Sequence, residues 1–137
     1  YFGEDLKGLK FGLWGLAFKP ETDDIREAPS IYIIEKLLDA GASVVAYDPE
    51  AMGNVKEILG NKISFSSSNY EAVDGVDALL IATEWSAFRN PDFNKMKSVM
   101  KQPIIFDGRN LYDLNSMSER PFYYHSVGRK VINNLNK

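Results

Sequence analysis

Three basic side chains in this sequence are candidates for binding an anion: Lys19, Arg26 and Arg109. Lys19 and Arg26 lie in "GLAFKPETDDIREAPS" (15–30), and Arg109 lies in "IIFDGRN" (104–110). Phosphate oxygens are natural partners for such a set, because a charge-assisted hydrogen bond contributes about 1.5–3 kcal/mol and arginine can donate two at once. If the fold brings the three cations together, they predict a site for a phosphate or a nucleotide.

The composition excludes several other kinds of site and partner. The net charge of −3 gives the protein no overall attraction for nucleic acid. The chain contains no cysteine and a single histidine, His125, which excludes a disulfide, a cysteine nucleophile and a thiolate or multi-histidine metal site within it. No apolar segment approaches the roughly 18 residues of a membrane span, and the first residues, "YFGEDLKG", contain no basic region followed by a hydrophobic segment. We therefore expect a soluble, cytoplasmic protein that binds no metal, membrane or nucleic acid.

The elements that would position the cations alternate between short apolar segments and helical patterns. Strands are predicted at 10–17, 43–49, 62–65, 77–83, 103–108 and 122–128, and helices at 30–40, 51–60, 69–75, 91–102 and 111–117. Short strands joined by helical crossovers favour a parallel sheet with helices on both faces. The 137 residues thus predict a single α/β domain, with a doubly wound, mainly parallel, Rossmann-like sheet of five or six strands.

The first helix has the clearest sequence signals. Pro29 suits the first helical position, where a missing N–H costs nothing. The apolar residues Ile31, Ile34 and Leu37 follow at helical spacing, and Gly41 is placed to end the helix in the left-handed conformation.

Polar and aromatic side chains follow three of the predicted strands. In such sheets ligands bind at the carboxyl ends of the strands, near the point where the strand order reverses. The first loop carries Lys19 and Arg26, the fifth carries Arg109, and Phe18 and Trp85 could flank a base or a ribose. This placement predicts that the cations share one edge of the sheet.

The first loop is a poor match to a dinucleotide fingerprint. G-x-G-x-x-G is expected between strand and helix, but this loop has Gly12 and Gly15 and no third glycine. Asp48, at the end of the second strand, could pair with a ribose only if a cofactor lay in this loop. The residues favour a phosphate or nucleotide role over dinucleotide binding by this domain alone.

Each candidate residue also has an ordinary structural explanation. Lys19 and Arg26 could pair with the acidic residues of their own loop, and Arg109 with Asp107 or Asp113. Trp85 could pack in the core, Asp48 could form a turn with Pro49, and His125 could be structural. Ion pairs in surface loops contribute little to stability, so spacing alone leaves both interpretations open.

Five segments together resemble the C-terminal domain of the UDP-glucose 6-dehydrogenase family. They are "GLAFKPETDDIREAPS" (15–30), "AYDPEAM" (46–52), "ATEWSAF" (82–88), "IIFDGRN" (104–110) and "FYYHSVGR" (122–129). Their order and spacing run through nearly the whole chain. The wider family includes dehydrogenases of GDP-mannose and UDP-N-acetylmannosamine, and "TEW" together with "FKPETDD" favours the UDP-glucose branch.

The resemblance implies an activity and a set of partners. In this family the N-terminal domain binds NAD and carries the catalytic cysteine, a helical middle segment makes the dimer, and the C-terminal domain closes over the UDP-sugar. Two hydride transfers to two NAD oxidise the primary alcohol to a carboxylate through a thioester. By motif, Phe18 and Lys19 would contact the UDP-sugar, Arg109 would bind it from the "DGR" turn, and Arg26 would reach NAD on the other domain.

We therefore expect residues 1–137 to be a nucleotide-sugar-binding C-terminal domain excised from a larger dehydrogenase. The whole enzyme would oxidise UDP-glucose to UDP-glucuronate as a homo-oligomer, while this chain alone, without the catalytic cysteine or the NAD-binding domain, would be inactive. Two alternatives remain: a dehydrogenase of another nucleotide sugar, and a nucleotide-binding module without catalytic activity.

Overall fold

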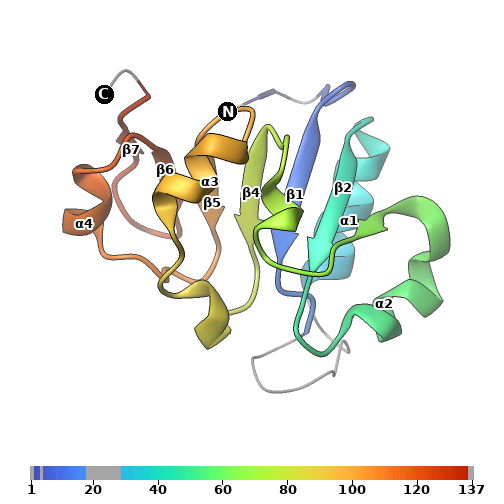
Figure 1. The fold of residues 1–137 in the computed structure, drawn as a ribbon. Coiled ribbons are helices and arrows are strands. Elements are labelled where there is room, and N and C mark those ends of the chain that lie inside the picture. The colour runs from blue at the N-terminus through green and yellow to red at the C-terminus, as the bar shows by residue number, and fades with distance from the viewer. Residues whose placement is uncertain (1, 4, 18–28, 136–137) are drawn as a thin grey trace.

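The computed structural model describes residues 2–3, 5–17 and 29–135, which build one seven-stranded sheet (Figure 1). The strands are β1 (Lys10–Trp14), β2 (Ser43–Tyr47), β3 (Ser64–Phe65), β4 (Ala78–Ile81), β5 (Ile104–Asp107), β6 (Tyr123–Ser126) and β7 (Ile132–Asn133). Their order across the sheet is β3-β2-β1-β4-β5-β6-β7. All neighbouring pairs from β3 to β6 are parallel, and β7 runs antiparallel to β6. The predicted parallel sheet is confirmed, with β7 as a strand that the sequence analysis missed.

Helices cover both faces of the sheet, as predicted. They are α1 (Pro29–Asp39), α2 (Met52–Leu59), α3 (Phe93–Val99) and α4 (Leu114–Ser118), with 3-10 turns η1 (Gly60–Lys62), η2 (Glu71–Val73) and η3 (Ser86–Phe88). In Figure 1, α3 lies in front of the sheet and α1 lies behind it. Ile34 of α1 and Val55 of α2 belong to one buried cluster, whereas Met96 of α3 and Met117 of α4 belong to another.

β1 lies in the interior of the sheet, between β2 and β4, and its sequence can be buried on both faces. Four of its five residues are buried, and it pairs with β2 on one side and β4 on the other. Gly12 in this strand is required by packing, since a Cβ there would lie 2.5 Å from the carbonyl oxygen of Ala72 in η2. The absence of a side chain lets η2 approach β1 closely.

The first helix forms as its sequence signals predict. α1 begins at Pro29, and Gly41 follows it with φ +97°, the left-handed conformation that glycine adopts most readily. The helix predicted at 69–75 is wrong in extent, because only the 3-10 turn η2 forms there. The Ser68 hydroxyl accepts the N–H of Glu71 at 3.1 Å, and Gly75, with φ +73°, leaves the helical conformation soon afterwards.

The strand order reverses between β1 and β4. From β1 the chain builds outward to β2 and β3, then crosses to β4 and continues to β5 and β6. The carboxyl ends of these strands share one edge, which is the lower edge in Figure 1. A sheet of this order places its ligand site at that edge, beside the reversal point.

Within residues 2–3, 5–17 and 29–135, no helix is long and apolar enough to cross a membrane.

Candidate nucleotide-binding site

Of the four residues that the resemblance assigns to the UDP-sugar or NAD, one lies in the described part of the chain. Phe18, Lys19 and Arg26 fall in the range 18–28, outside the described residues. Arg109 follows the last residue of β5, at the carboxyl edge of the sheet. The predicted grouping of three cations at this edge therefore stays a prediction, while the position of Arg109 is as expected.

A buried carboxylate holds the turn that carries Arg109. The side chain of Asp107 is 2% exposed, and its Oδ1 accepts the backbone N–H of Arg109 at 2.8 Å. Its Oδ2 accepts the backbone N–H of Leu111 at 2.7 Å and the hydroxyl of Tyr124 at 2.6 Å. Asn110, between these donors, has φ +55°. The turn is thus fixed through its backbone and does not depend on the Arg109 side chain.

The hydroxyl of Tyr124 links this turn to the end of β6. Tyr124 is fully buried, donates to Asp107 and accepts from Nη2 of Arg129 at 2.8 Å. Nε of Arg129 donates to the Ser126 hydroxyl at 2.7 Å. Burial, with the hydrogen bond to the Asp107 carboxylate, raises the pKa of Tyr124 well above its ordinary value. The residue therefore stays a neutral donor at physiological pH.

The Arg109 guanidinium pairs with Glu84, which follows β4. Nε of Arg109 donates to Oε2 of Glu84, and Nη2 donates to Oε1 at 3.0 Å. This two-bond pair lowers the pKa of Glu84 and raises that of Arg109. Of the partners expected for Arg109, Asp107 binds only its backbone, and Asp113 instead caps α4. The sequence assigned no role to Glu84; its place directly after the strand that neighbours β5 was the available signal.

Asp48 is a structural residue at the same edge. It is fully buried, and its Oδ2 accepts the N–H groups of Leu16 at 2.7 Å and Ala17 at 3.2 Å, together with the Trp85 indole N–H at 3.2 Å. Its Oδ1 accepts the N–H groups of residues 50 and 51, both at 2.8 Å. Five donors occupy the carboxylate, which leaves it no role with a ribose. The turn expected at Asp48-Pro49 is confirmed, and it also anchors the first loop.

The first loop is fixed as far as Ala17. Gly15 has φ +98°, and a Cβ there would lie 2.6 Å from Cβ of Thr83. The Thr83 hydroxyl donates to the carbonyl oxygen of Ala17 at 2.8 Å, and the Ser30 hydroxyl donates to that of Leu16 at 2.6 Å.

These hydrogen bonds are incompatible with NAD binding at the first strand-to-helix turn, because they use the groups that NAD would need. A dinucleotide site of that kind offers free backbone N–H groups to the diphosphate and a free acid to the ribose. Here the N–H groups of Leu16 and Ala17 donate hydrogen bonds to Asp48, and five donors already occupy the Asp48 carboxylate. The described residues of this turn do not fit NAD, in agreement with the missing third glycine.

Trp85 belongs to the core rather than to a stacking site. Its side chain is 5% exposed, it packs in the cluster that contains Trp14 and Phe88, and its indole N–H is bound to Asp48. The suggestion that Trp85 flanks a base is therefore wrong, and the core alternative holds. Trp14, in the same cluster, is fully buried.

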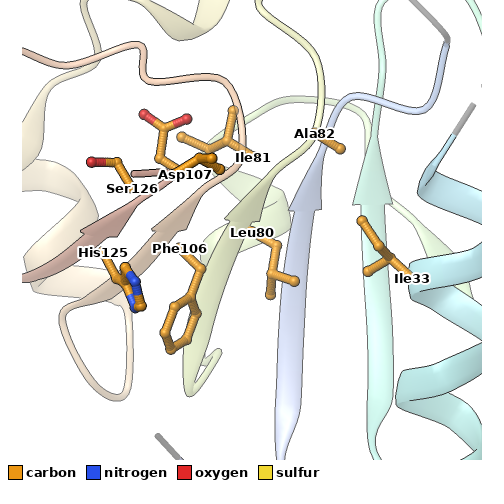
Figure 2. A pocket seen from close by; sticks show the side chains of 10 residues that line it. Ile33, Leu80, Ile81, Ala82, Phe106, Asp107, His125 and Ser126 are labelled. Carbon is orange, nitrogen blue, oxygen red and sulfur yellow. The ribbon is translucent and has the colours of Figure 1, made fainter. Parts of the chain in front are cut away.

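Two hollows open at the carboxyl edge. One, of about 260 Å³, is lined mainly by apolar groups, including Ile33, Leu80 and Phe106, with exposed His125 beside Phe106. In Figure 2 the side chains of Leu80, Phe106 and His125 lie on one side of the sheet, and those of Asp107 and Ser126 lie on the other. This hollow could take a flat, weakly polar ring.

The second hollow is polar and has a volume of about 520 Å³. It is lined by Glu84, Arg89, Gly108, Arg109, Asn110 and Val127. Two guanidinium groups and one carboxylate give this surface a net positive charge, which suits a phosphate. Gly108 and Val127 line both hollows, so the two adjoin each other.

Comparisons with known sequences identify relatives of the chain. Residues 12–114 match the family model described as UDP-glucose/GDP-mannose dehydrogenase family, UDP binding domain. The chain is 43% identical over 127 residues to a UDP-glucose 6-dehydrogenase from Rhizobium meliloti, covering 93% of this chain and 29% of that protein. It is 45% identical over 128 residues to the Pseudomonas aeruginosa UDP-glucose 6-dehydrogenase, covering 90% and 28%. The chain thus spans less than a third of the length of these relatives.

Solved structures show the same fold. A UDP-glucose dehydrogenase from Pyrobaculum islandicum superposes with a TM-score of 0.76 at 31% identity, covering 92% of this chain and 27% of that one. The UDP-N-acetyl-mannosamine dehydrogenase of Staphylococcus aureus superposes with a TM-score of 0.67 at 28% identity, covering 90% and 27%. With the sequence match across most of the sheet, these likenesses show that the chain belongs to the UDP-glucose/GDP-mannose dehydrogenase family, in the region that forms its UDP-binding domain.

Proposed function

We propose that this chain is the UDP-binding C-terminal domain of a UDP-glucose 6-dehydrogenase, which oxidises UDP-glucose to UDP-glucuronate. The relatives that carry this name match the chain at 43% and 45% identity over nearly its full length. The domain would bind the nucleotide sugar and orient it, and the redox chemistry would take place elsewhere in the intact protein.

The placement of Arg109 carries the proposal. The residue lies at the carboxyl edge of the sheet, on a turn whose backbone is fixed by Asp107, and its side chain is 37% exposed beside a polar hollow of about 520 Å³. An exposed guanidinium on a rigid turn is suited to a diphosphate, because little backbone conformational entropy remains to be lost on binding.

The remaining parts of the enzyme enter as parts of the same proposal. NAD would be the hydride acceptor and would be held outside this domain. This agrees with the first strand-to-helix turn, whose backbone N–H groups already donate to Asp48. Phe18 and Lys19 would contact the UDP-sugar, and Arg26 would reach NAD from this side. The intact enzyme would be a cytoplasmic homo-oligomer, and this domain alone would be inactive.

A second candidate differs only in the sugar. The likeness to the Staphylococcus aureus UDP-N-acetyl-mannosamine dehydrogenase supports a UDP-sugar other than UDP-glucose. Comparing UDP-glucose, UDP-N-acetylmannosamine and GDP-mannose as substrates of the intact protein, with NADH formation as the readout, separates these activities. No NADH with any of the three would favour the non-catalytic module.

UDP binding by the intact protein tests the site itself. We expect isothermal titration calorimetry to detect UDP, and Arg109→Ala to raise its Kd more than tenfold through the loss of a bidentate contact. Lys97→Ala, which removes an exposed positive charge on α3, is the matched control and should change the Kd less than twofold. A change below twofold for Arg109→Ala as well would contradict the assignment of Arg109.

A further inference from the structure

The pair between Arg109 and Glu84 leaves one edge of the guanidinium available. Arginine has five N–H donors, one on Nε and two on each terminal nitrogen. Glu84 takes the N–H of Nε and one N–H of Nη2. Within the described part of the chain, the other three N–H groups make no hydrogen bond. Two of these, one on each terminal nitrogen, point parallel to each other and can donate to a second anion, which accepts both bonds.

The residues on both sides of Glu84 are anchored by burial and hydrogen bonds. Glu84 lies between Thr83 and Trp85, both buried. The Thr83 hydroxyl donates to Ala17 in the first loop, and the Trp85 indole donates to Asp48 at the end of β2, so hydrogen bonds anchor both neighbours of Glu84. The backbone of Arg109 is tied to Asp107. The pair therefore joins two rigid loops on adjacent strands.

We propose that Glu84 is a positioning residue for nucleotide binding, which holds the side edge of the Arg109 guanidinium so that its end edge faces the diphosphate. This inference rests on the proposed function and names a further residue of the same site. A free arginine side chain has several rotatable bonds, and ordering it opposes binding; a partner that orders it beforehand removes that cost.

The carboxylate could instead act as a competitor of the phosphate. In that case the anion would have to displace Glu84, and removing the negative charge would strengthen binding. Two observations favour positioning. The pair uses the side edge and leaves the end edge exposed, and Arg89 lines the same hollow, so the local charge stays positive with Glu84 in place. The lowered pKa of Glu84 keeps it ionised at neutral pH.

Glu84→Gln in the intact protein tests the inference. Glutamine keeps one acceptor and loses the charge and the second acceptor, so Arg109 is no longer held at two points. We expect the KM for UDP-glucose and the Kd for UDP to rise five- to tenfold, with kcat changed less than twofold. Glu84→Ala should raise both at least as much. Glu57→Gln, the same change on an exposed residue of α2, should leave both within twofold.

A double-mutant cycle separates positioning from a general effect on folding. In an Arg109→Ala background, Glu84→Gln should cause less than a twofold further change, because its effect acts through the guanidinium. A KM or Kd that is unchanged or lower in the single Glu84→Gln variant overturns the inference, as does an equal effect in the Arg109→Ala background.

Failure of this inference can be told apart from failure of the proposed function. If the unmodified protein binds UDP and Arg109→Ala weakens binding, but Glu84→Gln does not, then only the positioning role fails. If the unmodified protein does not bind UDP, both fail.

Discussion

Replacing Asp48 by asparagine removes the centre of the hydrogen-bond arrangement at the carboxyl edge. Asparagine has nearly the same size and shape as aspartate, so packing is preserved and the change isolates the hydrogen bonds. If the carbonyl oxygen of the new side chain faces Leu16, Ala17 and Trp85, three bonds survive in neutral form. Its amide NH2 then faces two further backbone N–H groups, and both of those bonds are lost.

The magnitude follows from the strengths of charged and neutral bonds. A hydrogen bond to a charged group contributes about 1.5–3 kcal/mol, against about 1 kcal/mol for a neutral one. Two lost bonds therefore destabilise by about 3 kcal/mol, and weakening of the other three adds roughly 1–2 kcal/mol. Asparagine carries no charge, so the free-energy cost of burying the Asp48 carboxylate disappears, and this offsets part of the lost stability. We expect Asp48→Asn to lower the free energy of unfolding by about 3 kcal/mol, or Tm by roughly 10 °C.

Chemical denaturation of the intact protein measures this change. Asp92→Asn is the matched control, because Asp92 is exposed and accepts a single backbone N–H, from Lys95, as the N-cap of α3. Asparagine is an equally good N-cap, so the control should lie within about 0.5 kcal/mol of the original. A destabilisation below about 1 kcal/mol for Asp48→Asn would refute the view that five donors make this carboxylate structural.

Two further predictions concern the loop and the buried tyrosines. Gly15→Ala should destabilise the protein by roughly 3 kcal/mol or more, because φ is +98° and the new Cβ would clash with Thr83. In the same denaturation assay Gly53→Ala in α2 should be neutral or stabilising, because nothing lies within 4 Å of the new Cβ. Burial raises the pKa of Tyr112 and Tyr124, so absorbance titration should find that both resist ionisation at pH 11 in the folded protein. The contribution of the two buried tyrosines to the free energy of unfolding should be fully present below the ordinary tyrosine pKa of about 10 and fall above it, because the unfolded chain then loses protons that the folded chain keeps. Ionisation of every tyrosine near pH 10 without unfolding would contradict the burial argument.

The elements with strong local signals could be predicted from the sequence. Pro29 and Gly41 bound α1 as expected, since both act through backbone conformation that depends little on tertiary contacts. The parallel sheet followed from apolar segments alternating with helical ones. β7 was missed because two residues are too few for a periodic pattern, and its pairing with β6 is decided by tertiary packing.

The candidate site was only partly predictable. The position of Arg109 followed from the rule that ligands lie at strand ends, but its partner Glu84 comes from another strand, 25 positions earlier in the chain. The role of Asp48 depended on five donors gathered from three loops, which spacing could not reveal. The core position of Trp85 was also hidden from sequence spacing, because its indole N–H reaches the Asp48 carboxylate only when the sheet places β2 and β4 on either side of β1.

The two outermost strands of the sheet have a consequence for the behaviour of the protein in concentrated solution. β3 and β7 each contain only two residues. An exposed strand edge is a template on which a second chain can pair, and very short edge strands offer too few N–H and C=O groups for such pairing to persist. The fold thus ends its sheet on both sides in a way that discourages edge-to-edge aggregation, and it does so with the two strands that lie outside β2 and β6.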